Sequence, residues 1–170
     1  LHYYHTDEGL NYYVCDDTSF WRVVNFIDSV TFNASDDLKV IEATGKAFGE
    51  FQTRLSDFDG SVLYETIPDF HNTKKRLDVL FDHVEEDPCG RVAEVKKEIE
   101  YIATVREAAA ELSVQFANGE IPKRVTHNDT KLNNILMDAA TNEARAVIDL
   151  DTIMPGSMLY DFGDSIRFGA

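Results

Sequence analysis

Positive charge is scarce in this sequence of 170 residues. Lys and Arg together number 16 against 31 Asp and Glu, which gives a formal net charge of −15 at pH 7. Nucleic acids and anionic membranes are polyanions that bind to basic protein faces. The composition therefore excludes both as main partners, and we expect the acidic surplus to act mainly through solubility.

Cysteine is nearly absent, and long hydrophobic runs are missing altogether. Cys15 and Cys89 lie far apart and match no metal-binding spacing such as C-x-x-C. Two free thiols are typical of a reducing compartment, so we predict a cytoplasmic protein. No apolar stretch approaches the roughly 18 residues that a transmembrane helix needs, so no membrane partner is expected.

The hydrophobic content of 44% is sufficient for a globular protein with its own core. The sequence starts at Leu1 without an initiator Met and stops at Ala170 without a tail. We therefore expect a piece of a longer protein that is truncated at both ends. The sequence gives no indication of the oligomeric state.

The N-terminal segment is predicted to form a β-hairpin. Tyr12–Val14 and Phe20–Ile27 are rich in aromatic and β-branched residues, and residues 15–19 supply the turn between them. Such a hairpin is marginally stable alone, which indicates that it belongs to a larger sheet.

Amphipathic periodicity predicts three helices in the middle of the chain. The first begins at an N-cap at Ser35 and points Leu38 inward, the second begins near Asn72, and the third covers residues 90–118. After Pro122 the pattern changes to short β runs, namely Arg124–Thr126, Ile135–Met137 and Ala146–Ile148. The predicted fold class is α+β.

Residues 127–134 carry the pattern H-x-D-x-x-x-x-N between two of these short strands, and Asp149 follows the next strand. Phosphoryl transfer needs a carboxylate to orient or deprotonate the attacking hydroxyl, and oxygen ligands for Mg²⁺ on the ATP phosphates. Asp129 suits the first role. Asn134 and Asp149 suit the second, because Mg²⁺ takes one or two protein oxygens beside phosphate and water. A strand hairpin between them would bring these two ligands side by side.

Two further residues of this loop are candidates for the same chemistry. Lys131 is placed to reach the γ-phosphate as a point charge, and a solvated surface lysine is the alternative interpretation. His127 is a candidate for organising the loop through hydrogen bonds to the nearby backbone rather than for chemistry. Asp151 either contacts metal-bound water or substrate, or simply solvates its loop.

The stretch from His127 to Gly163 resembles the aminoglycoside phosphotransferase and choline kinase superfamily, which has the protein-kinase-like fold. The wording Thr-His-Asn-Asp-Thr-Lys-Leu-Asn-Asn at 126–134 is similar to that of the N-acetylhexosamine 1-kinase branch. The same branch is also similar to this sequence in two further segments, Ile-Asp-Leu-Asp-Thr-Ile-Met-Pro-Gly at 148–156 and Tyr-Asp-Phe-Gly-Asp at 160–164. The similarity is weaker at residues 65–71.

The resemblance implies a role for several residues. Asp129 would be the catalytic base, Asn134 and Asp149 would bind the metal, and Asp161 would support the catalytic loop from below. Residues 1–30 would be a remnant of the N-lobe hairpin and hinge, and residues 31–170 a partial C-lobe. The phosphate-covering loop and strand lysine of the family are not recognisable here, so we expect this chain alone to have no useful turnover.

The predicted function is a kinase that uses ATP and Mg²⁺ to phosphorylate a small molecule, with the anomeric hydroxyl of an N-acetylhexosamine as the leading acceptor. Another small acceptor, such as an aminoglycoside, choline or homoserine, is the first alternative. A nucleotide-binding pseudokinase scaffold is the second, although the base and both metal ligands are present in the sequence.

Overall fold

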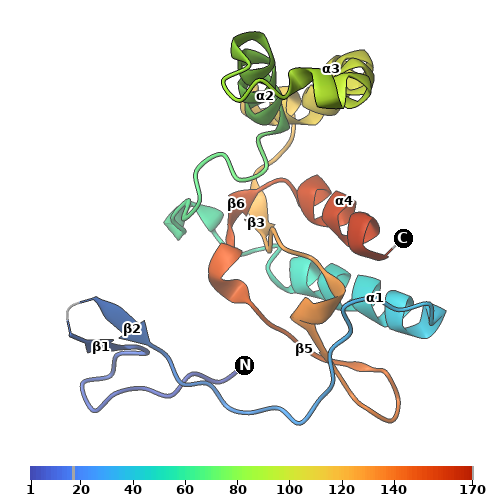
Figure 1. The fold of residues 1–170 in the computed structure, drawn as a ribbon. Helices are drawn as coiled ribbons and strands as arrows, with labels where there is room; N and C mark the ends of the chain where they lie inside the picture. Colours follow the sequence, from blue (N-terminus) through green and yellow to red (C-terminus); the bar gives the residue numbers. More distant parts are fainter. Residues whose placement is uncertain (17, 170) are drawn as a thin grey trace. The chain divides into compact units, whose positions relative to one another are not determined.

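The computed structural model describes residues 1–16 and 18–169. Within these residues the chain forms four α-helices and three two-stranded antiparallel sheets (Figure 1), which confirms the predicted mixture of helix and strand. The chain divides into two units. Unit 1 consists of residues 1–54, 129–150 and 164–170, and unit 2 of residues 55–128 and 151–163. The assignment of residues 1–30 to a separate lobe stays a prediction.

The predicted N-terminal hairpin is present in unit 1, but it is shorter than expected. β1 (Tyr13–Cys15) pairs with β2 (Ser19–Trp21), and Tyr13 lies opposite Trp21. Residue 17 of the predicted turn lies outside the described residues. The prediction of the second strand is wrong beyond Trp21, because residues 22–27 form only a single isolated β-bridge, between Val24 and Tyr3. Phe26 in this segment is 88% exposed.

The core of unit 1 forms where α1 (Leu38–Arg54) packs against β4 (Ile135–Met137) and β5 (Ala144–Val147). Its buried members come from the helix, from the loop before β4 and from β4 itself, namely Val40, Phe48, Leu132, Ile135 and Met137. The prediction that Leu38 points inward is wrong, since this side chain is 80% exposed. Val40, Thr44 and Phe48 form the buried stripe instead, at the four-residue spacing of one helix face.

The first helix begins at Asp37 rather than at the predicted cap Ser35. Asp37 Oδ1 accepts a hydrogen bond from the Lys39 backbone N–H at 2.9 Å, and its carbonyl oxygen accepts one from Ile41. Ser35 Oγ accepts from the Asp37 N–H at 3.1 Å. Ser35 therefore forms the turn before the helix, and Asp37 caps the helix by accepting from the N–H of Lys39, the second helical residue.

β4 and β5 form the hairpin that was predicted between Asn134 and Asp149, with Ile135 opposite Val147. β5 begins at Ala144, two residues earlier than expected, because the turn between the strands is short. Asp138 closes this turn by accepting hydrogen bonds from the backbone N–H groups of Ala140 and Thr141. Just beyond the last paired residues, the Ile148 N–H donates to the Asn134 carbonyl at 2.9 Å.

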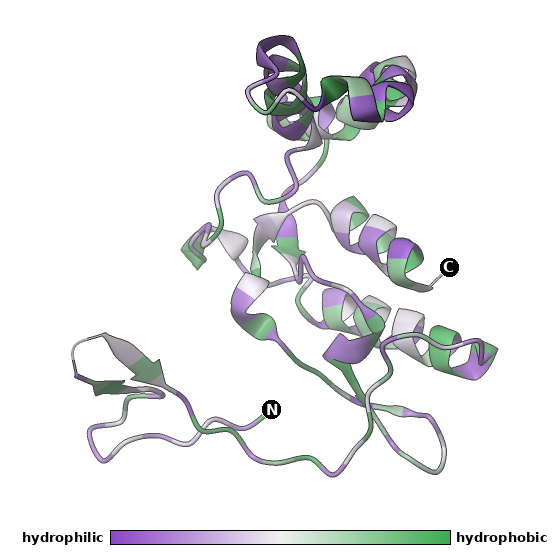
Figure 2. Cartoon of the chain, viewed as in Figure 1, coloured by the Kyte–Doolittle hydropathy of each residue, from purple (hydrophilic) through white to green (hydrophobic). Residues whose placement is uncertain are grey.

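Unit 2 contains two helices that lie side by side, α2 (Thr73–Glu86) and α3 (Lys96–Ala117) (Figure 1). Hydrophobic and hydrophilic residues are mixed along both helices, as Figure 2 shows, and among the described residues Ser113 is the only buried one in them. The second helix begins near Asn72, as predicted, and Asn72 is its N-cap, because its Oδ1 accepts from the Lys75 N–H at 3.0 Å. The third predicted helix starts late, since a 3-10 turn occupies Val92–Val95.

Of the remaining elements, one strand was predicted, its partner strand was missed, and the fourth helix was expected only as a motif. β3 (Arg124–Thr126) has the predicted bounds, and it pairs with β6 (Met154–Gly156), which was not predicted. A 3-10 turn at Leu150–Thr152 precedes β6. The fourth helix, α4 (Met158–Gly169), follows it and was expected only as a sequence motif. In the described part of the chain, no helix combines the length and apolarity needed to cross a bilayer.

Candidate functional site

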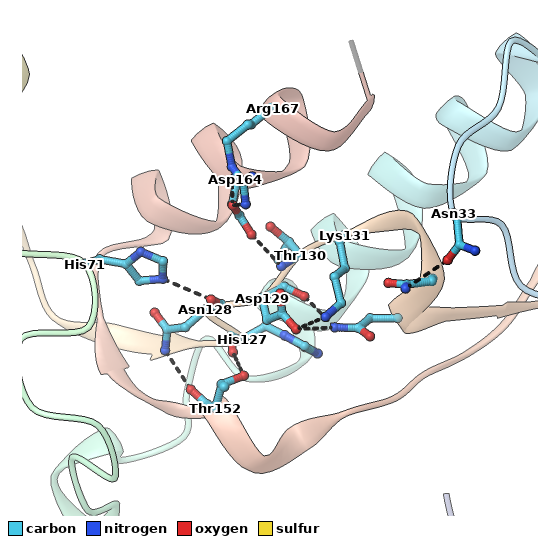
Figure 3. A network of polar contacts seen from close by, with 12 residues as sticks. Asn33, His71, His127, Asn128, Asp129, Thr130, Lys131, Thr152, Asp164 and Arg167 are labelled. Atoms are coloured by element: carbon cyan, nitrogen blue, oxygen red, sulfur yellow. Dashed lines mark hydrogen bonds and ion pairs between the residues drawn. The ribbon is translucent and has the colours of Figure 1, made fainter. Parts of the chain in front are cut away.

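The loop between β3 and β4 carries the predicted motif, and the boundary between the two units passes through it. His127 and Asn128 belong to unit 2, whereas Asp129 to Asn134 belong to unit 1. Each half is therefore described with the unit that holds it. Figure 3 shows the polar side chains of both halves.

In unit 2, one buried carboxylate holds the backbone of the loop. Asp161 lies in the first turn of α4 and is only 2% exposed. Its Oδ2 accepts from the His127 N–H at 2.9 Å, and its Oδ1 accepts from the Asn128 N–H at 2.7 Å. Charge-assisted hydrogen bonds of this kind offset the cost of burying the carboxylate. This is the supporting contact that the resemblance implies for Asp161, and its importance for activity stays a prediction.

Asn128 adopts the left-handed backbone conformation, with φ of 67°. Asn is one of the few residues that tolerate this region. Its Nδ2 donates to the Thr152 carbonyl at 2.9 Å, and the Thr152 hydroxyl donates to the His127 carbonyl at 2.7 Å. His127 itself is completely buried. A role in organising the loop therefore fits His127 better than contact with a substrate.

In unit 1, three of the predicted site residues lie together. The Lys131 ammonium forms a salt bridge with Asp129 Oδ2 at 2.7 Å. The Asn134 side-chain Nδ2 donates to the same Oδ2 at 2.8 Å and to the Asp129 carbonyl at 2.8 Å. Asp129 and Lys131 remain partly exposed, so a bound molecule can reach them. The turn Leu132–Asn134 brings these side chains together by folding the loop back on itself.

Asp149 lies two residues after β5, is exposed, and has a left-handed backbone with φ of 61°. The salt bridge to Asp129 raises the pKa of Lys131, although partial burial opposes it. The nearby charges of Asp149 and Asp164 raise this pKa further. Lys131 therefore carries its positive charge within the combined field of three carboxylates, one of which is the predicted metal ligand Asp149.

The sequence analysis missed Asp164 as a residue of this site. Its Oδ2 accepts from the Thr130 backbone N–H at 3.1 Å, and its Oδ1 forms an ion pair with Arg167 Nη2 at 2.6 Å. Asp161 and Asp164 are three residues apart on α4 and so share a helix face. The spacing D-x-x-D within the predicted motif was the signal that could have revealed the second contact.

Asp151 belongs to unit 2, whereas Asp129, Lys131, Asn134 and Asp149 belong to unit 1. Asp151 is exposed, lies in the 3-10 turn of unit 2, and its carbonyl accepts from the Thr66 hydroxyl at 3.4 Å. Among the described residues, no cluster of three or more His, Cys, Asp or Glu side chains is suited to hold a metal.

Asn134 and Asp149 nevertheless fit Mg²⁺ by the chemistry of their donor atoms. Both amide protons of Asn134 are directed to Asp129, so its Oδ1 is the atom that it can offer a cation. Asp149 adds a carboxylate. Mg²⁺ is commonly held by one or two protein oxygens and completes its shell with water and phosphate.

The model of one protein family matches the chain over its full length. This family is the phosphotransferase enzyme family, and the match covers residues 1–170. The chain therefore belongs to the phosphotransferase enzyme family. The expected relationship to the aminoglycoside phosphotransferase and choline kinase superfamily is confirmed at this level, together with the fold class. The protein is a phosphotransferase that acts on a small molecule.

Proposed function

We propose that the protein transfers the γ-phosphate of ATP to a hydroxyl of a small acceptor, with the C1 hydroxyl of an N-acetylhexosamine as the leading candidate. The observation that carries the proposal is the cluster of Asp129, Lys131 and Asn134 in unit 1, with Asp149 contributing to the same electrostatic field. Carboxylate, cation and metal ligands are the groups that phosphoryl transfer requires.

Asp129 is the proposed base. Lys131 and Asn134 hold its Oδ2 from two sides, which fixes the carboxylate relative to the loop backbone. A fixed carboxylate orients the attacking hydroxyl and accepts its proton as the bond to phosphorus forms. Preorganisation of this kind is effective because the group needs no rearrangement during the reaction.

Lys131 supplies positive charge beside the base. Its ammonium is protonated at neutral pH, and the contact with Asp129 raises its pKa further, so it can neutralise charge on the transferred phosphoryl group. Asn134 Oδ1 and Asp149 would hold Mg²⁺, which supplies charge neutralisation on the phosphate oxygens when it is bound. Family members generally use ATP and Mg²⁺, which supports this assignment.

The acceptor class rests on the resemblance of residues 126–134, 148–156 and 160–164 to the N-acetylhexosamine 1-kinase branch. The net charge of −15 is compatible with the alternative of a cationic acceptor, such as an aminoglycoside or choline. A pseudokinase scaffold is the weaker alternative, because Asp129, Asn134 and Asp149 are all present.

The test is the release of ADP from Mg-ATP by the protein that carries this chain, over a panel of free hexoses, N-acetylhexosamines, choline and aminoglycosides. We expect an N-acetylhexosamine to drive release, and Asp129→Asn to lower kcat by about 10²-fold or more, since general-base catalysis contributes about that much. Asp36→Asn, on the exposed segment before α1, is the matched control. Turnover that survives Asp129→Asn would refute the role of the base. If no acceptor on the panel is phosphorylated, the acceptor class is wrong.

A further inference from the structure

One side chain of the turn Leu132–Asn134 has no part in the proposed phosphoryl-transfer groups. Asn133 is the middle residue of this turn, and its Nδ2 donates to Asn33 Oδ1 at 3.2 Å. Figure 3 draws this bond at Asn33, which lies 100 positions earlier in the sequence. Asn33 and Asn133 both belong to unit 1, so the contact is complete within one unit.

The other end of the Asn133 amide is buried without a partner. Among the described residues, its Oδ1 is the one buried side-chain oxygen or nitrogen that makes no hydrogen bond. An unpaired acceptor in the interior costs free energy, because it loses its bonds to water and gains none in return. The side chain is therefore held in place by its donor, while its acceptor opposes burial.

The three side chains of the turn lead to three different places. Leu132 lies in the hydrophobic core of unit 1 and is only 2% exposed. Asn134 donates twice to Asp129 through its Nδ2. Asn133, between them, is tied to Asn33. Because the peptide group that joins Asn133 to Asn134 is planar, the orientation of Asn133 sets the direction from which Asn134 leaves the turn.

The segment that carries Asn33 is itself anchored to the β4–β5 hairpin. Val30 and Met137 exchange two backbone hydrogen bonds of 2.9 Å each, so this segment extends the hairpin at the edge of β4. Arg145 on β5 donates from Nη1 to the carbonyl oxygen of Asp28 at 2.9 Å. A hydrogen bond between two supported groups loses little conformational entropy when it forms, so the bond from Asn133 to Asn33 can fix the turn.

We propose that Asn33 and Asn133 are positioning residues for Asn134, the proposed ligand of Mg²⁺. Their hydrogen bond holds the middle of the turn, and the two bonds from Asn134 to Asp129 hold its end, so that Asn134 Oδ1 keeps one direction. The unpaired Oδ1 of Asn133 distinguishes positioning from a contribution to stability, because an apolar side chain would be buried here without that cost. The inference rests on the proposed function and deepens it, since it assigns the support of the metal ligand.

The first test replaces Asn133 in the protein that carries this chain. Leu has the same branching at Cγ as Asn, so Asn133→Leu removes the donor together with the unpaired acceptor. We expect the free energy of unfolding, measured in urea, to stay unchanged or to rise, because the removed acceptor opposed folding. The Kd of Mn²⁺, a paramagnetic substitute for Mg²⁺ followed by electron paramagnetic resonance with ADP bound, should rise about fivefold, as for the loss of one hydrogen bond. A purely structural role predicts the opposite pair of results, a lower free energy of unfolding and an unchanged Kd.

Asn33 supplies the matched variants. Asn33→Asp keeps an acceptor for Asn133 Nδ2 and should keep the Kd of Mn²⁺ within about twofold of wild type, whereas Asn33→Ala removes the acceptor and should raise the Kd about fivefold. The double variant Asn33→Ala/Asn133→Leu should bind no more weakly than either single variant, because both changes break the same bond. Asn11→Ala, at an exposed position of unit 1, is the control and should leave the Kd unchanged.

Wild-type Kd values in both Asn133→Leu and Asn33→Ala would show that the bond does not position Asn134, and the inference falls. If the wild-type protein binds no Mn²⁺ with ADP, the metal role within the proposed function fails instead. Amide exchange at the Asn134 N–H, which donates to the Lys131 carbonyl at 3.0 Å, then tests the support by itself. Faster exchange in Asn133→Leu and Asn33→Ala supports a bond that fixes the turn, and exchange at the wild-type rate overturns it.

Discussion

Removal of the Asp161 carboxylate should disturb the backbone at His127 and Asn128, where the loop begins. The carboxylate accepts hydrogen bonds from two successive backbone N–H groups, those of His127 and Asn128, and all three residues are almost fully buried. In Asp161→Asn the shape is conserved, but one oxygen becomes an NH₂ group. That group faces a backbone N–H, so one buried donor loses its acceptor and a second unpaired donor is created.

The cost can be worked from these two bonds. A hydrogen bond to a charged group contributes about 1.5–3 kcal/mol, and a buried donor left without a partner costs about 1–3 kcal/mol. Since Asn keeps one neutral bond, we expect the loop to lose about 3 kcal/mol. At 1.4 kcal/mol for each factor of ten, local opening of the loop becomes about 100-fold more frequent.

Amide hydrogen exchange followed by NMR measures this opening directly, at the N–H groups of His127 and Asn128. We expect both to exchange about 100-fold faster in Asp161→Asn, because opening precedes exchange at a buried amide. Asp36→Asn, the same substitution at an exposed position, should leave them unchanged. Equal exchange in Asp161→Asn and wild type would refute the view that this carboxylate holds the loop.

Two further predictions concern the supports of the site. A Cβ on Gly156 would lie 2.4 Å from Thr126 Oγ1. We therefore expect Gly156→Ala to lower the free energy of unfolding, measured in urea, by about 1–3 kcal/mol. Gly49→Ala is the control, because a Cβ at this position on α1 meets no atom within 4 Å, and it should not lower the free energy of unfolding. The backbone hydrogen bond from Ala140 is the largest of the contacts that lower the pKa of Asp138 from 3.8 to about 2. A lowered pKa contributes stability above about pH 4 that is lost as the pH falls toward 2. Wild type and Asp138→Asn should therefore differ in thermal unfolding at pH 7 and converge near pH 2, and a constant difference would contradict this.

Local signals made several elements predictable from the sequence. Arg124–Thr126 and Ile135–Met137 are short β-branched or aliphatic runs between polar loops, and the structure gives both strands the predicted bounds. The start of the second helix near Asn72 was predictable because helix starts depend on local signals, namely one side chain and the next few backbone N–H groups. The hairpin between Asn134 and Asp149 follows from two neighbouring strands and a short turn.

Elements that depend on distant partners were not predictable in this way. β6 consists of Met154, Pro155 and Gly156, which have little strand propensity, and it is a strand only because β3 pairs with it. The hydrophobic periodicity of the first helix allows either of two faces to point inward. Packing against β4 and β5 selects the face of Val40 and Phe48 over that of Leu38.

The left-handed backbone at Asp149 gives one reason, independent of function, for finding an Asp at this position. Asn128 and Asp149 both have positive φ, and in this region Asn and Asp are tolerated better than other residues with a side chain. The turn after β5 therefore requires a residue of this kind, whether or not a metal binds. Asn would satisfy the backbone equally well, so it is the negative charge of Asp149, felt by Lys131 in the same unit, that backbone geometry leaves unexplained. At Asn128, by contrast, the left-handed backbone and the hydrogen bond to Thr152 account for the residue fully.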